Sequence, residues 1–522
     1  MQTSGEAARQ PADLPPGKPD RRKRFAWALG DAGDKTRLRW PEWCALVLYA
    51  ALVAFAIPYH EPFVNEAQAW QLARTLSLAS LFHTFIHYEG SPILWHFLLW
   101  LMVRAHVSYA GLHWICGAIG TAAAGVLIFK SPFPRYLRLS LPFTYFLIFQ
   151  YAVVARNYVL APLMLFGVAA CWKKRPIFVT ILLGLLANTA LHVAVISGGL
   201  AIVYAIEQMR GEGGKDAGRR RELLCCALLL IAFYGFAAWT AHPPHDLAMT
   251  RVRGESRPFL VSAVQSLLWG MCEPMLLSAP FWVVISLWFA ARRKIIYLLP
   301  VLLFGAFCGA VIFNWWHVGL LVPLLISIMW MNWSAPGSKP YEFETAGRVA
   351  LAIMIVSQIL WSGFAIYYDH DYAYAPDRAA AEFLKPYVKQ GAGIAVTYVN
   401  KGKEYQSRAF PVIGILPYFD RNIFVNTPYP FWYWSSQDPS DARFDAAVEA
   451  HVPIVLVAVV NQYPVAQPDL DHPVFTSLAQ HGYRHLATFC GTMPQGFKLR
   501  FNMCDVFYGL GTENNSENGG RR

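Results

Sequence analysis

Charged residues are scarce in this sequence. Only 15% of its 522 residues are Asp, Glu, Lys or Arg, whereas 56% are hydrophobic and 15% are aromatic. A chain of this length with so little charge is too apolar for a soluble globular protein. Apolar runs of membrane-spanning length recur from Trp43 to Tyr368, which predicts a polytopic α-helical membrane protein.

Several motifs that would indicate other functions are missing. There is no phosphate-binding loop, zinc-protease motif or nucleophile elbow, so nucleotide-driven chemistry in the cytoplasm is not expected. Residues 1–40 are polar and basic and contain no apolar core, so we expect no cleavable signal peptide. We interpret these residues as a disordered cytoplasmic tail. The net charge of +11 fits the positive-inside bias and does not indicate nucleic acid.

Basic loops predict the membrane topology, because they mark the inside. These loops are residues 173–175, 210–221 and 292–294. Apolar runs alternating between them predict an odd number of spans, about eleven. Region 91–138 does not fit, because a full crossing at 109–129 would leave Lys130, Arg135 and Arg138 outside. We therefore expect a short, re-entrant or split segment there, near Gly117 or Gly120.

The spans divide the chain into regions. Residues 41–370 form the predicted membrane module, and residues 59–90 form an outer-face loop within it. Residues 371–510 are predicted to form an extracytoplasmic α/β domain, and residues 511–522 a disordered tail. Helices are expected over 376–389 and 442–451, and strands over 393–399, 409–416, 422–427 and 452–460.

Cysteine usage separates the two main regions. Seven of the nine cysteines lie in or next to spans, where they act as small hydrophobic residues. Cys490 and Cys504 lie in the outer region on either side of an expected hairpin, and an oxidising compartment favours a disulfide between them. Two unpaired thiols are the alternative.

The first outer loop contains the most informative pattern. Glu66, Trp70 and Arg74 fall at i, i+4 and i+8 and so share one face of a helix. A carboxylate, an aromatic ring and a cation at a membrane interface suit chemistry on a lipid-linked substrate. An interfacial helix whose charges only face water would show the same pattern.

Three further ionisable residues stand in or beside apolar segments, where charge is costly. They are Arg156, His192 and His317. Interfacial anchoring explains each one singly. The predicted topology, however, places all three at the same membrane face as Glu66 and Arg74. Cations there would neutralise a lipid phosphate while a carboxylate deprotonates an acceptor hydroxyl.

The order of these features resembles that of the GT-C glycosyltransferases, multispan enzymes such as protein O-mannosyltransferases and the aminoarabinose transferase of lipid A. Asn65-Glu66 in VNEAQAWQLAR is similar to the acidic pair that opens the family's first outer loop. YEGSPILWHFLLW, from Tyr88 to Trp100, resembles the element that begins the next span. Arg156-Asn157-Tyr158 matches an Arg-x-Tyr element, and residues 188–192 resemble a later span bearing Asn and His.

This resemblance implies transfer of a sugar from a polyprenyl-phosphate donor to a hydroxyl of a glycan, lipid or protein. The reaction would invert configuration at the outer face of a bacterial inner membrane, with Glu66 as the base. The residues implied in binding the donor phosphate or substrate are Arg74, His87, Glu89, Arg156, Tyr158, His192 and His317. Two positions depart from the family pattern: Asn65 replaces an acid, and Ser91 replaces a histidine.

Some related enzymes bind a divalent metal through an Asp-x-Asp triplet. The sequence offers only Asp369-His370-Asp371, far from the first loop, so we expect no metal and no cofactor. Tryptophans are expected to line a groove for isoprene units or to form a lipid-facing belt: Trp70, Trp95, Trp100, Trp315 and Trp316. A non-catalytic scaffold and a transporter of cell-envelope glycolipids remain alternatives, although no internal repeat supports a transporter.

Overall fold

The computed structural model describes most of the chain. The described residues are 39–210, 217–247, 258–311, 313–334, 341–400, 410–436, 439–460, 472–492 and 506–512. The two predicted disordered tails fall almost wholly outside these ranges.

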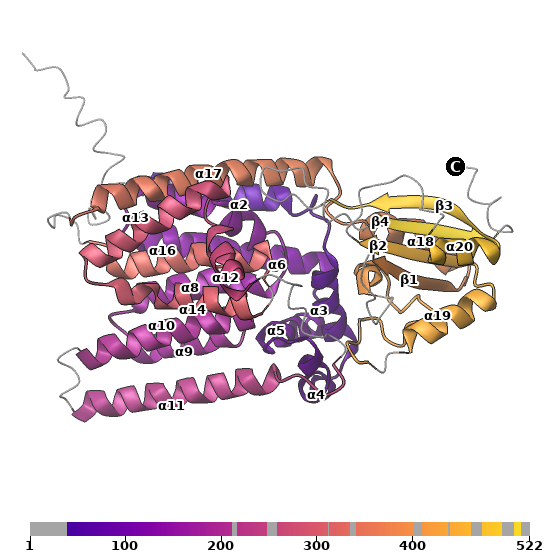
Figure 1. Cartoon of the computed structure of the whole chain (residues 1–522), viewed down its shortest axis with the longest axis horizontal. Helices are drawn as coiled ribbons and strands as arrows, with labels where there is room; N and C mark the ends of the chain where they lie inside the picture. Colours follow the sequence, from indigo (N-terminus) through magenta and orange to yellow (C-terminus); the bar gives the residue numbers. More distant parts are fainter. Residues whose placement is uncertain are drawn as a thin grey trace, which may run out of the picture.

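Helices form a bundle, and a small sheet region lies at one end of it (Figure 1). The helices of the bundle and its connections are α2 (Trp40–Ala56), α3 (Val64–Thr75), α4 (Leu78–His83), α5 (Leu94–Arg104), α6 (Tyr109–Lys130), α7 (Arg135–Ser140), α8 (Leu160–Cys171), α9 (Pro176–Ala187), α10 (Leu191–Arg210), α11 (Ala217–Thr240), α12 (Phe259–Leu268), α13 (Ser278–Ala291), α14 (Leu299–Ala310), α15 (Trp315–Val318), α16 (Leu321–Asn332) and α17 (Glu344–Asp371).

Many of these helices are apolar enough for a membrane. Five stretches combine sufficient length and hydropathy to cross one: Tyr109–Lys130, Leu191–Arg210, Arg220–Thr240, Trp315–Asn332 and Glu344–Asp371. Seven further apolar helices of 10–17 residues pack among them. The predicted class is thereby confirmed in its coarse form: the chain is mostly helical, with several apolar helices compatible with a multi-pass membrane protein.

The exposed face of α11 shows the same preference for an apolar environment. Leu224, Leu228 and Ile231, spaced at i, i+4 and i+7, are each more than half exposed. A stripe of exposed leucine and isoleucine along a whole helix is unfavourable in water and favourable in lipid.

Region 91–138 contains one short helix and one unbroken helix. α5 has 11 residues, so at 1.5 Å per residue it is ~16 Å long, about half the thickness of a bilayer core. α6 continues through Gly117 and Gly120 without interruption, so the predicted break at these glycines is wrong. Gly120 instead allows close packing, because a Cβ there would lie 2.6 Å from the Cβ of Ala152.

Two irregular segments run through the bundle instead of regular helices. The first covers residues 141–159 and contains η2 (Leu141–Phe143), the π-helical η3 (Phe146–Gln150) and η4 (Asn157–Val159). The second covers residues 269–277 between α12 and α13 and contains η6 (Met275–Leu277).

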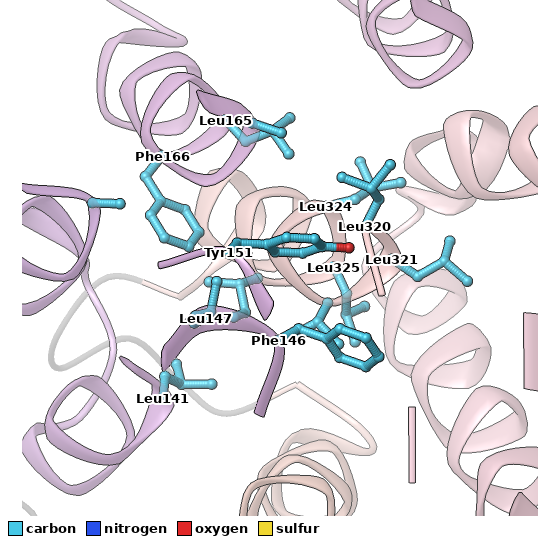
Figure 2. Close-up of a cluster of buried hydrophobic side chains, with 14 of the residues drawn as sticks. Leu141, Phe146, Leu147, Tyr151, Leu165, Phe166, Leu320, Leu321, Leu324 and Leu325 are labelled. Atoms are coloured by element: carbon cyan, nitrogen blue, oxygen red, sulfur yellow. The ribbon is translucent and has the colours of Figure 1, made fainter. Parts of the chain in front are cut away.

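Side chains of α17 form hydrogen bonds with backbone carbonyl groups that have no regular helical partner in these irregular segments. Ser362 Oγ donates to Phe143 O at 2.7 Å, and Gln358 Nε2 donates to Gly270 O at 2.8 Å. Tyr151 OH donates to Trp316 O at 2.7 Å, and leucines of α15–α16 and α8 surround its ring (Figure 2). Irregular backbone inside an apolar bundle is stable where such internal partners exist.

The sheet region has four strands in the order β1-β2-β4-β3. They are β1 (Ile394–Asn400), β2 (Ile454–Val460), β3 (Tyr483–Cys490) and β4 (Val506–Thr512). β1 and β2 are parallel, whereas β4 is antiparallel to both β2 and β3. The accompanying helices are α18 (Asp377–Lys389), α19 (Ser440–Glu449) and α20 (Pro473–Gln480) (Figure 1). Buried residues lie on both faces of the sheet.

Predictions for this region were right for the helices and for two strands. α18, α19, β1 and β2 match them. The predicted strand 409–416 is wrong, because residues 410–418 form the 3-10 helix η8 (Phe410–Tyr418). Val412, Ile413 and Ile415 are all fully buried there, a pattern that the two-sided alternation of a half-buried strand does not give. The predicted strand 422–427 is reduced to one bridge, between Ile394 and Phe424.

β3 and β4 form an antiparallel pair in which Cys490 lies opposite Val506. The expected hairpin between Cys490 and Cys504 lies in residues 493–505, outside the described residues. The proposed disulfide partner, Cys504, lies outside the described residues.

The sheet region packs on α3 through side-chain contacts with backbone. Gln68 exchanges two hydrogen bonds with the backbone of Trp432, at 2.8 and 2.9 Å. Arg74 donates to the carbonyl of Phe419 at 2.7 Å and contacts that of Leu416 at 3.4 Å. We call this end of the bundle, where residues 57–93 lie, the α3 end.

Candidate functional site

Glu66 lies in the first turn of α3 with its carboxylate fully buried. Oε1 accepts from the amide of Phe63 at 2.8 Å and lies 3.5 Å from His60 Nε2. Oε2 accepts from the amide of Ala155 at 2.6 Å and lies 3.2 Å from His113 Nε2. Four donors therefore surround this carboxylate, and no part of it faces solvent.

His60 extends the contacts of Glu66 to α17. Its Nδ1 lies 3.1 Å from Asp369 Oδ2, so Glu66, His60, His113 and Asp369 form one buried set, which we call the acid–histidine network. Burial opposes the charge on Glu66, but hydrogen bonds from His113 and His60 outweigh it and hold the pKa of Glu66 well below its usual range. Burial likewise opposes the charge on His60, and the charges of Asp369 and Glu66 outweigh it, raising the pKa of His60 to about 10.

Glu89 has a different environment. Its carboxylate is 12% exposed, Oε1 accepts from Gln68 Nε2 at 2.8 Å, and Oε2 lies 3.9 Å from His96 Nε2. Burial raises the pKa of Glu89 to about 7, against the opposing hydrogen bonds from Gln68 and Trp434. A carboxyl group with this pKa exchanges protons readily near neutral pH, as a general base must.

Arg156 is the cation best placed to bind an anion at the α3 end. Its guanidinium lies over the ring of Trp316 at 4.8 Å and near that of Tyr158 at 5.4 Å. Within the described residues it has no carboxylate partner and no hydrogen-bond acceptor. A half-buried arginine without a counter-charge is costly, so an anionic ligand would be bound strongly at this position.

Two predicted histidines lie beside Arg156. The rings of His192 and His317 stack with centroids 3.9 Å apart, and Tyr158 packs on His317 at 5.6 Å. The first turn of α10 positions His192, and the short helix α15 positions His317. Sequence reasoning therefore brought together three distant segments that do meet.

The Glu89 and Arg156 segments meet at the turn between α9 and α10. Thr189 O accepts from Asn157 Nδ2 at 3.1 Å and from Ser91 Oγ at 3.5 Å. The amide of Leu94 donates to Asn188 O at 3.1 Å. The segment that follows Glu89 and the segment that follows Arg156 therefore both contact the α9–α10 turn.

Two predicted binding residues lie apart from these segments. Arg74 directs its guanidinium to the backbone carbonyls of Leu416 in η8 and of Phe419 just after it. His87 lies 3.1 Å from His242 O and packs on Trp239 of α11. Neither residue joins Arg156 in the structure.

The predicted tryptophan groove is not formed by the residues expected. Four of the five tryptophans are at least 94% buried, so they are packed within the bundle and form neither a groove nor a lipid-facing belt: Trp70, Trp95, Trp315 and Trp316. Trp100 is partly buried and donates to Leu76 O at 3.2 Å. An apolar groove of about 530 Å³ lies instead between α2 and α17. Phe143 and Ile148 of the irregular segment 141–159 contribute to its wall.

The Asp-x-Asp triplet is split between environments. Asp369 is buried against His60, whereas Asp371 bonds to its neighbour His370 at the surface. Among the described residues, no group of three or more His, Cys, Asp or Glu side chains has the arrangement of a metal site. The absence of a cofactor stays a prediction.

Sequence reasoning missed three members of the acid–histidine network. His60 directly follows the first apolar run, and His113 lies near the start of the run 109–129. An ionisable residue at the end of a span was a usable signal, but nothing in the sequence indicated that these side chains converge on Glu66.

No protein-family model, curated protein or solved structure matches this chain.

Proposed function

We propose that this protein is a multi-pass membrane glycosyltransferase of the bacterial inner membrane. It moves a sugar from a polyprenyl-phosphate donor to a hydroxyl of a glycan, lipid or protein at the outer face, inverting configuration. The observation that carries the proposal is that the segments of Arg156, a free cation, and of Glu89, a carboxyl group with a pKa of about 7, both donate a hydrogen bond to Thr189 O.

The proposed topology has eleven crossings and places the α3 end outside. The crossings are α2, α6, residues 141–159, α8, α9, α10, α11, α12 together with α13, α14, α16 and α17. α5 is too short to cross, so both its ends stay at the outer face and α6 runs inward. Lys130, Arg135 and Arg138 then lie inside, which removes the conflict with the positive-inside rule.

A pair of ion contacts supports this orientation. Arg135 Nε and Arg138 Nη2 donate to Glu42 Oε1 at 3.0 and 2.9 Å. Glu42 lies in the first turn of α2, directly after the basic tail. The start of α2 and the basic α6–α7 turn therefore lie at the same end of the bundle.

In the proposed reaction, Glu89 takes the proton of the acceptor hydroxyl. The hydroxyl oxygen forms a bond to the anomeric carbon as the bond from that carbon to the phosphate oxygen breaks. The polyprenyl phosphate leaves with the bonding electrons, and Arg156 stabilises the charge that develops on it. His192, His317 and Tyr158 border this position, and the α2–α17 groove offers an apolar surface for the prenyl chain.

The geometry favours Glu89 over Glu66 as the base. Glu66 is closed from solvent and occupied by four donors, so an acceptor hydroxyl has no route to it. A general base must come within hydrogen-bond reach of the proton it removes. We assign Glu66 a structural role, in which it links α3 to α6 and to the irregular segment 141–159.

A transporter remains the second candidate, because two irregular segments interrupt the bundle, as in many secondary transporters. In the described residues, however, α17 pairs with backbone groups of both segments, at Phe143, Gly270 and Glu273. The void beside Tyr49 and Tyr151 measures only about 10 Å³, far below the size of a small-molecule site.

The test measures how much a sugar-free polyprenyl phosphate raises the melting temperature of the purified protein. Arg156→Lys replaces a fork matched to phosphate oxygens by a point charge, so the ligand-induced shift should largely disappear. Arg104→Lys is the matched control, because Arg104 also lies over a tryptophan at the α3 end and bonds only to a carbonyl. Equal shifts in wild type and Arg156→Lys would contradict the assignment of Arg156.

Turnover is followed without knowledge of the acceptor. Membranes containing the protein are incubated with a lipid extract, and consumption of polyprenyl-phosphate sugars is measured by mass spectrometry. Wild-type membranes should consume one sugar class, and Glu89→Gln membranes should not. Equal consumption by wild-type and Glu89→Gln membranes would contradict the proposed reaction.

A further inference from the structure

A second cavity lies at the opposite end of the bundle from Glu89 and Arg156. Its volume is about 360 Å³, within the range of small-molecule sites. Three chain segments form it: the turn after α8, the last turn of α10, and the turn between α13 and η7 (Ile295–Leu298).

The cavity is strongly basic. Four cations and one carboxylate line it, for a formal charge of +3: Lys173, Arg210, Arg293, Lys294 and Glu207. Glu207 is already engaged, because it bonds to Lys294 and accepts from Trp172 Nε1 at 2.9 Å. Within the described residues, Lys173, Arg210 and Arg293 have no side-chain partner.

The backbone at Arg293 is unusual for an arginine. Its φ is 55°, in the left-handed region that glycine adopts at lower cost. The amides of Arg293 and Lys294 close the end of α13 by donating to Ala290 O and Phe289 O at 2.8 and 2.9 Å. Glycine would suit this helix end better, so the arginine side chain is retained against a local conformational cost.

The cavity has one buried wall and exposed apolar side chains on the helices that form it. Trp172 is buried and also donates to Tyr297 OH at 3.0 Å. Ile177 and Phe178 of α9, Ile202 of α10 and Ile295 are each close to half exposed. A ligand that suits these surroundings combines an anionic head with apolar chains.

We propose that this cavity binds the phosphate headgroup of an anionic phospholipid. Three cations without partners supply the charge for a phosphate, and the neighbouring exposed side chains contact the acyl chains. Basic pockets between helices at a cytoplasmic face are suited to such headgroups. The lipid would join α8, α10 and α13, and the site does not depend on the proposed transferase reaction.

The experiment measures lipid retention by the full-length protein in detergent, with native mass spectrometry. Phosphatidylglycerol is the probe, and phosphatidylcholine and inorganic phosphate are the comparisons. Wild type should retain phosphatidylglycerol and exclude phosphatidylcholine. Lys173→Ala with Arg210→Ala should weaken retention about 25-fold, at roughly fivefold for each cation. Arg175→Ala, on the same loop but outside the cavity lining, should leave it unchanged.

Arg293→Gly separates binding from folding. It removes a cation and relieves the left-handed backbone, so retention should fall about fivefold while the melting temperature of the lipid-free protein holds or rises. A fall in melting temperature with unchanged retention would overturn the role of Arg293.

Three further results would overturn the lipid assignment. Equal retention of phosphatidylcholine would show that headgroup charge is not recognised. Displacement of phosphatidylglycerol by millimolar inorganic phosphate would identify a free-anion site. The sequence also has two acids after Arg210, Glu212 and Asp216. If only the double variant Glu212→Gln with Asp216→Asn retained phosphatidylglycerol, these acids and not a lipid would be the anion that the cavity binds in the wild type.

Discussion

Glu66 and Glu89 lie on the same loop yet occupy opposite kinds of environment. Glu66 has no exposed surface and four donors around it, and its pKa lies below the usual range. Glu89 is 12% exposed and has two side-chain donors, Gln68 at 2.8 Å and Trp434, and burial raises its pKa to about 7. The comparison shows that burial alone does not activate a carboxylate. The number of donors decides whether burial produces a fixed anion or a proton acceptor.

The largest expected effect is on folding, for Glu66→Gln. The amide would face two backbone amides and two histidines with one acceptor instead of two, and it would leave His60 without one of its counter-charges. Breaking a buried charged set in this way costs about 3 kcal/mol, or roughly a 150-fold change in the folding equilibrium. The measurement is denaturation of the purified variant in detergent. Glu382→Gln, which changes an exposed carboxylate, is the control.

The pKa shifts of the network predict how this stability depends on pH. The pKa of Glu66 is lowered on folding, so its contribution is present above ~4.5 and is lost as the pH falls further. The pKa of His60 is raised to about 10, so its contribution is complete below ~6.5 and is lost as the pH rises through 10. Stability should therefore be greatest between about pH 5 and 6.5. A melting temperature that rises from pH 6.5 to 10 would contradict the network.

Sites formed by a local sequence pattern were easier to predict than sites formed by helices that pack together. The apolar runs identified the bundle, and charge at span ends identified Arg156, His192 and His317, which do cluster. The acid–histidine network combines the end of α2, the start of α6 and the end of α17. No periodicity relates such positions, so their contacts follow only from helix packing.

The same limit explains the error at η8. Residues 409–416 have the apolar composition of a strand, but this segment lies between α3 and α18 and is buried on every side. Gly414 allows the approach to α18, because a Cβ there would overlap Asp377. The sequence shows the glycine but not the neighbouring helix that requires it.

Glu89→Gln should have the largest effect on turnover, a loss of at least ~100-fold, because a general base is removed. The variant should fold normally, since Gln can still accept from Gln68. Consumption of polyprenyl-phosphate sugar measures the loss. Glu61→Gln alters a carboxyl group of the same loop whose pKa is also raised by burial, and it should retain activity. If Glu61→Gln is inactive and Glu89→Gln active, the comparison between Glu66 and Glu89 chose the wrong carboxyl group.

The pH dependence of turnover should follow the ionisation of Glu89. A base must be deprotonated to act, so the rate should rise through pH 7 and level off above 8. With a pKa of about 7, the active fraction rises roughly tenfold between pH 6 and pH 8. A rate already level at pH 5 would be the profile of a carboxylate with a low pKa, and would return the base role to Glu66.

The smallest effect is expected for Gln68→Met, which changes the proton affinity of Glu89 without touching its carboxyl group. Gln68 donates to Glu89 Oε1 at 2.8 Å and thereby opposes the rise in its pKa. Without this donor the midpoint of the rate profile should move to higher pH, with roughly a threefold loss at pH 7 that disappears by pH 9. Gln68 also holds Trp432 of the sheet region through two backbone hydrogen bonds. A loss of activity that is equal at all pH values would therefore mean that Gln68 acts by docking that region, and that the pKa of Glu89 is set by burial alone.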